Sequence, residues 1–187
     1  SLENRMRYPI EIFKAIREVW PEGKPISVRI SAHDWTPGGI TPADSVDIAK
    51  AFAQAGADII DCSSGQVSKE EKPIYGRMFQ TPFADRIRNQ AKIPTIAVGA
   101  IFEADNANTI IAAGRADLCA VARPHLANPA WILTEGAKSG FADMPWPKQY
   151  VAAKIQLERN LEREKAQASA AKNAMSFEQI TQIFGEV

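Results

Sequence analysis

The sequence is poor in cysteine, with only Cys62 and Cys119 among its 187 residues. Two cysteines exclude a disulfide-stapled miniprotein, and their separation fits no metal-ligand or redox motif. We interpret both as small buried apolar residues. This cysteine usage suits a reducing cytoplasm, which is the location that we expect for the protein.

An excess of charge of one sign and long apolar runs are also missing. Lys+Arg total 22 against Asp+Glu 22, so the net charge of +0 gives no electrostatic reason to expect nucleic acid or an anionic membrane as partner. No apolar run approaches the roughly 18 residues of a membrane span, and the amino terminus is too polar for a signal peptide. The composition, 45% hydrophobic and 24% charged, is that of a globular protein.

Four short apolar runs, each bounded by Gly, Pro or polar residues, predict strands that are buried on both faces. They are Ile26–Ile30, Asp58–Cys62, Thr95–Val98 and Leu118–Val121. The segments between or after them open with helix-start signals, at Thr41-Pro42, Thr81-Pro82 and Asn128-Pro129. Because the connections are this short, the alternation predicts parallel strands with right-handed crossovers.

The spacing of the strands predicts half of a barrel. Strands that start roughly 20 to 35 residues apart match a (βα)8, or TIM, barrel, whose eight units fill about 250 residues. Only four units occur here, preceded by one helix over Ile10–Trp20. We therefore predict an α/β fold in which residues 1–143 form the second half of a TIM barrel. Ala55–Ile60 and Ala113–Leu118 also read alike, which indicates a repeated βα unit.

Residues 144–187 differ in character from the rest of the chain. Met144–Pro147 contains two prolines and predicts a rigid connector. A helix-forming stretch, Tyr150–Lys172, follows, and Ser176 with Gln179 makes a capping box for a separate last helix. We expect this helical tail to pack on a neighbouring subunit or on domain surface outside this chain, in preference to being freely solvated.

The residues after the third and fourth runs predict a phosphate site. In parallel barrels, ligands bind at the carboxyl ends of the strands, and the last two loops often hold phosphate. Gly99 allows backbone N–H groups to approach an anion, and Arg123 offers a bidentate cationic group. Taken alone, Gly99 reads as a turn glycine and Arg123 equally well as half of a surface ion pair. Their occurrence at consecutive strand ends favours a phosphate cradle.

Arg29 is a cation inside an apolar strand, where it needs a partner. It either pairs with Asp58 or Asp61 on the adjacent strand, or faces a ligand that gains negative charge, such as a reduced isoalloxazine. His33 and Asp34 follow the same strand and could form an acid–base pair. Because adjacent residues rarely orient one another, we assign no catalytic residue.

The long loop Ser63–Gln80 combines cations with aromatic residues. Its cations are Lys69, Lys72 and Arg77, and its aromatic residues are Tyr75 and Phe79. The loop either governs substrate selectivity or forms a solvated lid. The sequence contains no nucleophile elbow, P-loop, zinc-ligand spacing or G-x-G-x-x-G.

One stretch at the amino terminus and four stretches at the predicted strands or their ends can be compared with known families. They are Ser1–Arg7, Val28–Ala32, Asp61–Gly65, Ala97–Ile101 and Gly114–Arg123. Together they resemble the carboxyl half of the old yellow enzyme family of FMN-dependent oxidoreductases, where an S-x-x-N-R-x-R stretch like Ser1–Arg7 lies in mid-barrel. Within that family, Gln66–Phe79 and Ala122–Leu126 are most similar to the reductase-like carboxyl-terminal domain of salicylyl-CoA hydroxylase and 2-aminobenzoyl-CoA monooxygenase.

The resemblance implies FMN as cofactor and NAD(P)H as the reductant of the whole enzyme. Arg29 would then face the pyrimidine edge of the flavin, while Gly99, Ala122 and Arg123 would hold the FMN phosphate. Relatives often carry Gly where Ala122 stands, and the Arg that some relatives supply to a neighbouring active site is missing after Tyr150. The family's substrate-binding His/Asn or His/His pair and its proton donor belong to the first half of the barrel, which has no counterpart here.

We therefore expect the FMN-binding half of a flavin-dependent oxidoreductase or monooxygenase that acts on a small-molecule substrate, for which an activated, aromatic CoA ester is one candidate. The missing amino-terminal barrel half would be its partner, the isolated chain would be inactive, and we expect a homo-oligomer. Two alternatives stay open. One is a phosphate-binding barrel enzyme of sugar-phosphate or amino-acid metabolism. The other is a self-associating assembly module, because an open half barrel exposes two strand edges.

Overall fold

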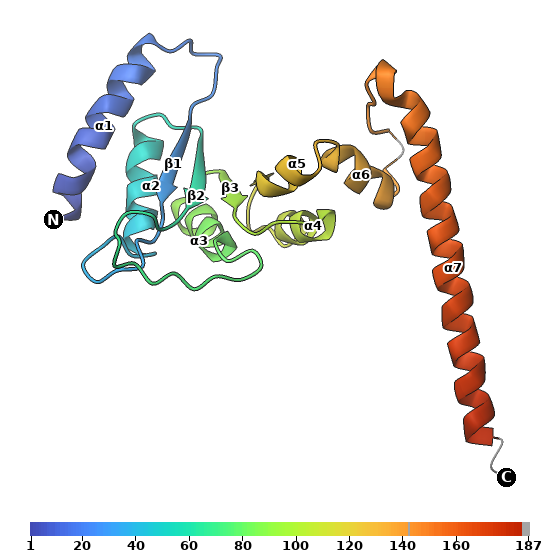
Figure 1. The fold of residues 1–187 in the computed structure, drawn as a ribbon. Helices are drawn as coiled ribbons and strands as arrows, with labels where there is room; N and C mark the ends of the chain where they lie inside the picture. Colours follow the sequence, from blue (N-terminus) through green and yellow to red (C-terminus); the bar gives the residue numbers. More distant parts are fainter. Residues whose placement is uncertain (142, 185–187) are drawn as a thin grey trace. The chain divides into compact units, whose positions relative to one another are not determined.

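The four predicted strands form one parallel sheet in a computed structural model that describes residues 1–141 and 143–184. The strand order is that of the chain: β1 (Ser27–Ser31), β2 (Ile59–Ser63), β3 (Thr95–Val98) and β4 (Leu118–Ala120) (Figure 1). This sheet and its helices confirm the α/β prediction and match a partial TIM barrel. The chain divides into two units, Ser1–Ala127 and Asn128–Val187. The proposed extent of the barrel half, to residue 143, stays a prediction.

The register of the sheet separates a buried face from an open one. Ile30 is paired with Cys62 and Cys62 with Ala97, and all three side chains are buried. Successive residues of a strand point to opposite faces. The neighbouring row therefore lies on the other face, and it runs Arg29, Asp61, Ile96, Leu118. Leu118, on the edge strand, is 55% exposed.

Three helices cover the buried face of the sheet. They are α2 (Asp44–Gln54), α3 (Thr81–Ala91) and α4 (Ala104–Ala112). Phe52, Ile87 and Ile110 enter the core from these helices, where they join Ile60 of β2. Each such buried side chain contributes about 1.5–3 kcal/mol relative to an exposed position. The core therefore lies between sheet and helices and leaves the strand ends free to build a site.

The similar segments Ala55–Ile60 and Ala113–Leu118 form the same hydrogen bonds in the structure. Asp58 accepts the backbone N–H of Ile26 (2.7 Å), just before β1, and Asp117 accepts the N–H of Thr95 (2.9 Å), at the start of β3. An arginine pairs with each carboxylate: Arg17 with Asp58 and Arg88 with Asp117. Both aspartates thus close the amino end of the neighbouring strand, on the edge of the sheet opposite the predicted site.

The first helix, α1 (Leu2–Val19), begins eight residues earlier than the sequence predicted. The sequence predicts a start at Ile10, directly after a proline, which cannot donate the N–H that a helix interior requires. In the structure Ser1 caps the helix by accepting the N–H of Asn4, and Pro9 lies inside it. The predicted start at Ile10 is therefore wrong.

The first unit ends with a short helix, α5 (Arg123–Ala127), and the second unit is helical throughout its described elements. These are α6 (Trp131–Lys138), η1 (Lys148–Tyr150) and α7 (Val151–Phe184). The predicted break before Ser176 is wrong, because α7 is one continuous helix. The side chains of the capping box lie outside the described residues. No helix of the described chain is long and apolar enough to cross a membrane.

Candidate functional site

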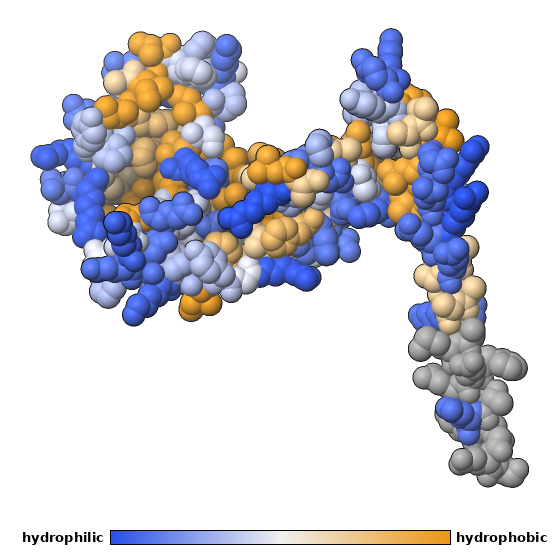
Figure 2. All heavy atoms as spheres, viewed as in Figure 1, coloured by the Kyte–Doolittle hydropathy of each residue, from blue (hydrophilic) through white to orange (hydrophobic). Residues whose placement is uncertain are grey.

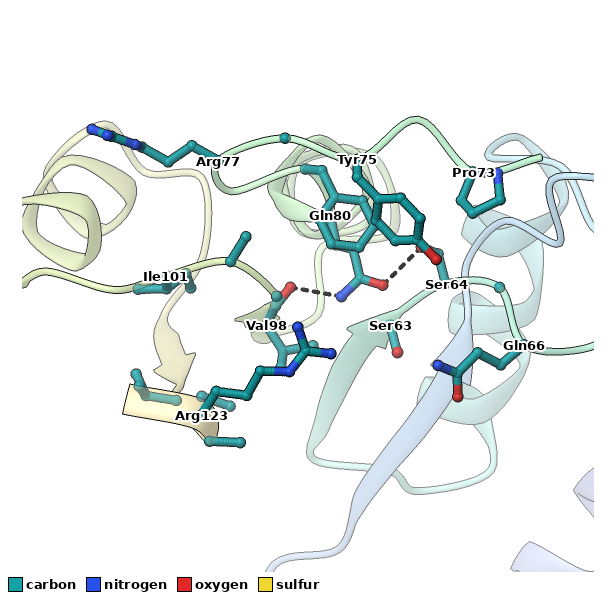
Figure 3. A pocket seen from close by; sticks show the side chains of 18 of the residues that line it. Ser63, Ser64, Gln66, Pro73, Tyr75, Arg77, Gln80, Val98, Ile101 and Arg123 are labelled. Carbon is teal, nitrogen blue, oxygen red and sulfur yellow. Dashed lines mark hydrogen bonds between the residues drawn. The ribbon is translucent and has the colours of Figure 1, made fainter. Parts of the chain in front are cut away.

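A cavity of about 980 Å³ lies at the carboxyl ends of the four strands. Ser31, Ser63, Val98 and Ala120, the last residues of β1 to β4, all line it. The same cavity brings together the residues that the sequence assigned to the cofactor: Arg29, Gly99, Ala122 and Arg123. The long loop after β2 supplies much of the remaining wall (Figure 3).

Arg29 forms the ion pair that one interpretation of the sequence predicted, and it also lines the cavity. Its Nη1 donates to Asp61 Oδ2 (3.0 Å) and its Nη2 to Ser63 Oγ (3.0 Å), while the side chain lines the cavity and stays 56% exposed. The alternative partner, Asp58, pairs with Arg17 instead. The Asp61 side chain is only 16% exposed. A half-buried carboxylate and a hydroxyl therefore hold the guanidinium in one orientation at the wall of the cavity.

Arg123 differs from Arg29 in having no ion-pair partner among the described residues. It stands at the start of α5, directly after β4, and its guanidinium points toward the centre of the cavity (Figure 3). Arg77 lines the same cavity from the loop, but its side chain points away from Arg123 (Figure 3). Arg123 therefore supplies positive charge that no carboxylate neutralises, at the strand end where a barrel commonly binds phosphate.

Gly99 occupies a position that excludes any side chain. Its φ is +103°, and a Cβ there would lie 2.4 Å from Gln80 Nε2 and 3.2 Å from Phe79 Cε1. The next residue, Ala100, also has a positive φ of 52°. The chain thus turns sharply after β3 through two successive positive φ angles, and both residues of the turn line the cavity.

Gln80 and Ser64 belong to the site and were missed by the sequence analysis. Gln80 is only 4% exposed, its Oε1 accepts from Ser64 Oγ (2.7 Å), and its Nε2 donates to the carbonyl of Val98 (2.8 Å). No motif marks Gln80, since its partners lie 16 and 18 residues away in sequence. The one available signal is that Gln80 directly precedes the Thr81-Pro82 helix start, and such a position lies between a strand end and the following helix.

The loop between β2 and α3 is held in place and lines the cavity. The Glu71 carboxylate accepts the N–H of Gln66, the N–H of Lys72 donates to the carbonyl of Trp35 (3.0 Å), and the N–H of Met78 donates to the carbonyl of Ala100 (3.1 Å). Near its end, the rings of Tyr75 and Phe79 meet edge to face with centroids 5.2 Å apart, and both residues line the cavity.

His33 and Asp34 do not form an acid–base pair. His33 Nδ1 accepts the N–H of Trp35 (2.7 Å), and the two rings stack with centroids 4.4 Å apart. The Asp34 carboxylate accepts from Ser31 Oγ (2.9 Å) and from the N–H of Ile40 (2.7 Å). Neither residue lines the cavity. Both order the turn after β1.

The cysteines behave as small apolar residues in the structure. Burial raises the pKa of the Cys62 thiol to about 12, and it raises the pKa of Cys119 as well. Neither thiol is therefore ionised near neutral pH. Within the described part of the chain, no three His, Cys, Asp or Glu side chains gather as a metal site would require.

Together, the fold and the site define a partial (βα)8-barrel protein with a cavity at the carboxyl ends of its strands, lined by Arg29 and Arg123. A comparison with protein families then gives the particular group. Residues 1–144 match the NADH:flavin oxidoreductase / NADH oxidase family, and the chain belongs to that family. FMN is the cofactor of this family and NAD(P)H its reductant, as the resemblance implied. This result favours FMN over the sugar-phosphate alternative.

The curated relatives are longer than this chain. An NADPH dehydrogenase of Geobacillus sp. (strain WCH70) is 42% identical over 159 residues, which are 85% of this chain and 44% of that protein. An NADPH dehydrogenase of Bacillus subtilis (strain 168) is 39% identical over 150 residues, 80% of this chain and 43% of the relative. The chain therefore spans less than half the length of these relatives.

A solved structure gives a similar result for the fold. 2-Naphthoyl-CoA reductase, determined in complex with 2-naphthoyl-CoA, superposes with a TM-score of 0.63 at 28% sequence identity. The match covers 75% of this chain and 22% of that chain. Like the curated relatives, it includes far more protein than the four βα units present here.

Proposed function

We propose that this chain is the FMN phosphate-binding half of an NAD(P)H-dependent oxidoreductase. In this proposal Gly99, Ala122 and Arg123 hold the phosphate, and Arg29 faces the flavin ring. The observation that carries it is that these residues, which come from three different strands and strand ends, line one cavity in a chain of this family.

The residues fit FMN in charge and in shape. Arg123 offers a cation without an ion-pair partner among the described residues, and Gly99 lines the cavity at the turn after β3, where its positive φ favours glycine. Ala122 is exposed beside Arg123 after β4, although its methyl group restricts the approach of a phosphate more than a glycine would. When bound, FMN supplies the hydride chemistry, and the protein supplies binding, orientation and electrostatics. Arg29, fixed by Asp61 and Ser63, presents a cation to the ring.

An aromatic CoA ester is the substrate that we propose for the whole enzyme. The structural likeness to 2-naphthoyl-CoA reductase supports this class of substrate. The Tyr75–Phe79 pair also supports it, because edge-to-face rings in the cavity wall suit contact with a planar aromatic group. The choice between a reductase and a monooxygenase reaction lies beyond this half of the barrel.

The isolated chain is incomplete for catalysis in this proposal, and an amino-terminal barrel half is its partner. The matched part makes up only 44% of the length of two of the curated relatives, so more than half of their sequence lies outside it. Among the described residues, neither a His nor an Asn lines the cavity, and the resemblance assigns the family's proton donor to the first half of the barrel. Purified chain with FMN should therefore oxidise NADH or NADPH no faster than free FMN does. Steady oxidation above that control would overturn the inactivity.

Self-association is proposed for the chain when no other barrel half is present. β1 and β4 are the outer strands of the sheet, and each has one edge that pairs with no other strand of the described residues. Figure 2 shows apolar surface at the carboxyl end of α1, and along that helix Tyr8 is 68% and Val19 83% exposed. Light scattering tests this, and a monomer mass at all concentrations would contradict it.

A cytoplasmic location also stays a prediction.

The deciding experiment is a flavin-fluorescence titration of the chain with FMN and with riboflavin. Arg123→Ala removes the free cation and should weaken FMN binding roughly 10- to 100-fold, the equivalent of a charge-assisted hydrogen bond of about 1.5–3 kcal/mol. Riboflavin, which lacks the phosphate, should bind equally to both proteins. Arg77→Ala is the matched control, since Arg77 lines the cavity but points away. FMN binding that is absent even after addition of a relative's first barrel half would overturn the proposal.

A further inference from the structure

Gln80 joins three segments that are distant in sequence but meet at the cavity. It directly precedes α3, and its side chain is bonded to Ser64, which follows β2, and to Val98, which ends β3 (Figure 3). The amide is 4% exposed although Gln80 lines the cavity. Both ends of the amide are therefore used inside the protein.

The chemistry of the partners fixes the orientation of this amide. A backbone carbonyl only accepts hydrogen bonds, so the nitrogen of Gln80 must face Val98. Its oxygen then faces Ser64, whose hydroxyl donates. A flipped amide would place two acceptors together at Val98, at 2.8 Å. Gln80 thus has one orientation, and the end of β3 is held by it.

The turn after β3 is packed directly against Gln80. The ideal Cβ position of Gly99 is 2.4 Å from Gln80 Nε2, so the amide occupies the space of the missing side chain. A second tether acts one residue later, where the carbonyl of Ala100 accepts the N–H of Met78 (3.1 Å). The positive φ angles of Gly99 and Ala100 are therefore maintained by contacts on the residues just before α3.

We infer that Gln80 is the positioning residue for the phosphate-binding turn at Gly99–Ala100. The inference rests on the proposed function, because it concerns the same FMN phosphate. An anion that binds backbone N–H groups gains most when these groups are already aligned, since ordering them on binding costs conformational entropy. Gln80 aligns the turn through Val98, and Ser64 in turn holds the Gln80 amide. Neither side chain needs to touch the ligand.

The test uses Gln80→Leu, which keeps similar volume and removes both hydrogen bonds. We expect FMN binding to weaken about tenfold, as for the loss of one to two ordinary hydrogen bonds. Riboflavin affinity should stay unchanged, because the ring contacts remain. Ser64→Ala should give a smaller loss, and Gln90→Leu, an exposed glutamine of α3, none. A purely structural role would lower the affinity for both flavins together, so an unchanged FMN-to-riboflavin ratio would overturn the inference.

A second measurement needs no ligand and separates this inference from the proposed function. The ¹⁵N heteronuclear NOE of the Gly99 and Ala100 amides should report a rigid turn in the wild-type chain and a mobile one in Gln80→Leu. Equal rigidity in both proteins would overturn the positioning role of Gln80. A wild-type chain with a rigid turn that binds no FMN would instead count against the proposed function alone.

Discussion

Replacing Gly99 by alanine probes the turn after β3 most directly. The φ of +103° makes an L side chain unfavourable by about 1–2 kcal/mol. The new Cβ would also lie 2.4 Å from Gln80 Nε2, so the amide must move. Displacing it loses two hydrogen bonds of roughly 1 kcal/mol each. We therefore expect Gly99→Ala to lower the free energy of unfolding by about 3–4 kcal/mol.

Urea denaturation followed by circular dichroism measures this loss, and Gly38→Ala is the matched control. Gly38 also has a positive φ, of 74°, but a Cβ there meets nothing within 4 Å. It should therefore lose only the backbone contribution of about 1–2 kcal/mol. In a Gln80→Ala background the amide is already gone, and the loss caused by Gly99→Ala should fall toward that of the control, with only the contact to Phe79 Cε1 at 3.2 Å remaining. Equal losses for Gly99→Ala and Gly38→Ala in the wild-type background would refute the reasoning.

Three further predictions concern the core, the thiols and the acid stability. Ile110→Ala should lower the free energy of unfolding by about 2–5 kcal/mol, whereas Ile111→Ala, at a 43% exposed neighbour, should change it by no more than about 0.5 kcal/mol in urea denaturation. In the native chain at pH 8, Ellman's reagent should label Cys119 before Cys62, because Cys62 is 0% exposed and its pKa is about 12; equal rates would contradict this. The Thr41 hydroxyl lowers the pKa of Asp44, so the carboxylate stabilises the fold above its unfolded pKa of about 4 and loses this effect as the pH falls through the folded pKa. Thermal melts of Asp44→Asn should accordingly show a flatter decline of Tm in acid.

Much of the fold followed from local pattern, because parallel βα units repeat a simple order of strand, turn and helix start. The run Thr95–Val98 coincides with β3, and the other strands lie within one residue of their predicted bounds. The predicted start of α1 at Ile10 was wrong, because Ser1 caps a helix that continues through Pro9. The predicted break in the tail helix before Ser176 was also wrong, because a capping pattern inside a helix-forming stretch does not by itself interrupt the helix.

The site was predictable only as far as strand ends determine it. Arg29, Gly99 and Arg123 could be placed because each lies in or just after a strand, and parallel strands bring these positions to one edge. Gln80 could not be placed, because its role depends on hydrogen bonds to segments that only the sheet brings close. The position of Arg29 was predicted, but its choice of Asp61 over Asp58 follows from the register, which pairs Arg29 with Asp61.

The sheet order also determines how this chain can assemble during synthesis. Each strand pairs with the strand made immediately before it, after roughly 20 to 35 further residues, and no strand waits for a partner from the distant end of the unit. Pairing can thus advance from β1 to β4 in the order of translation, with each βα segment using the preceding one as a template. Of the four strand ends that surround the cavity, the one at β4 and Arg123 is the last to leave the ribosome.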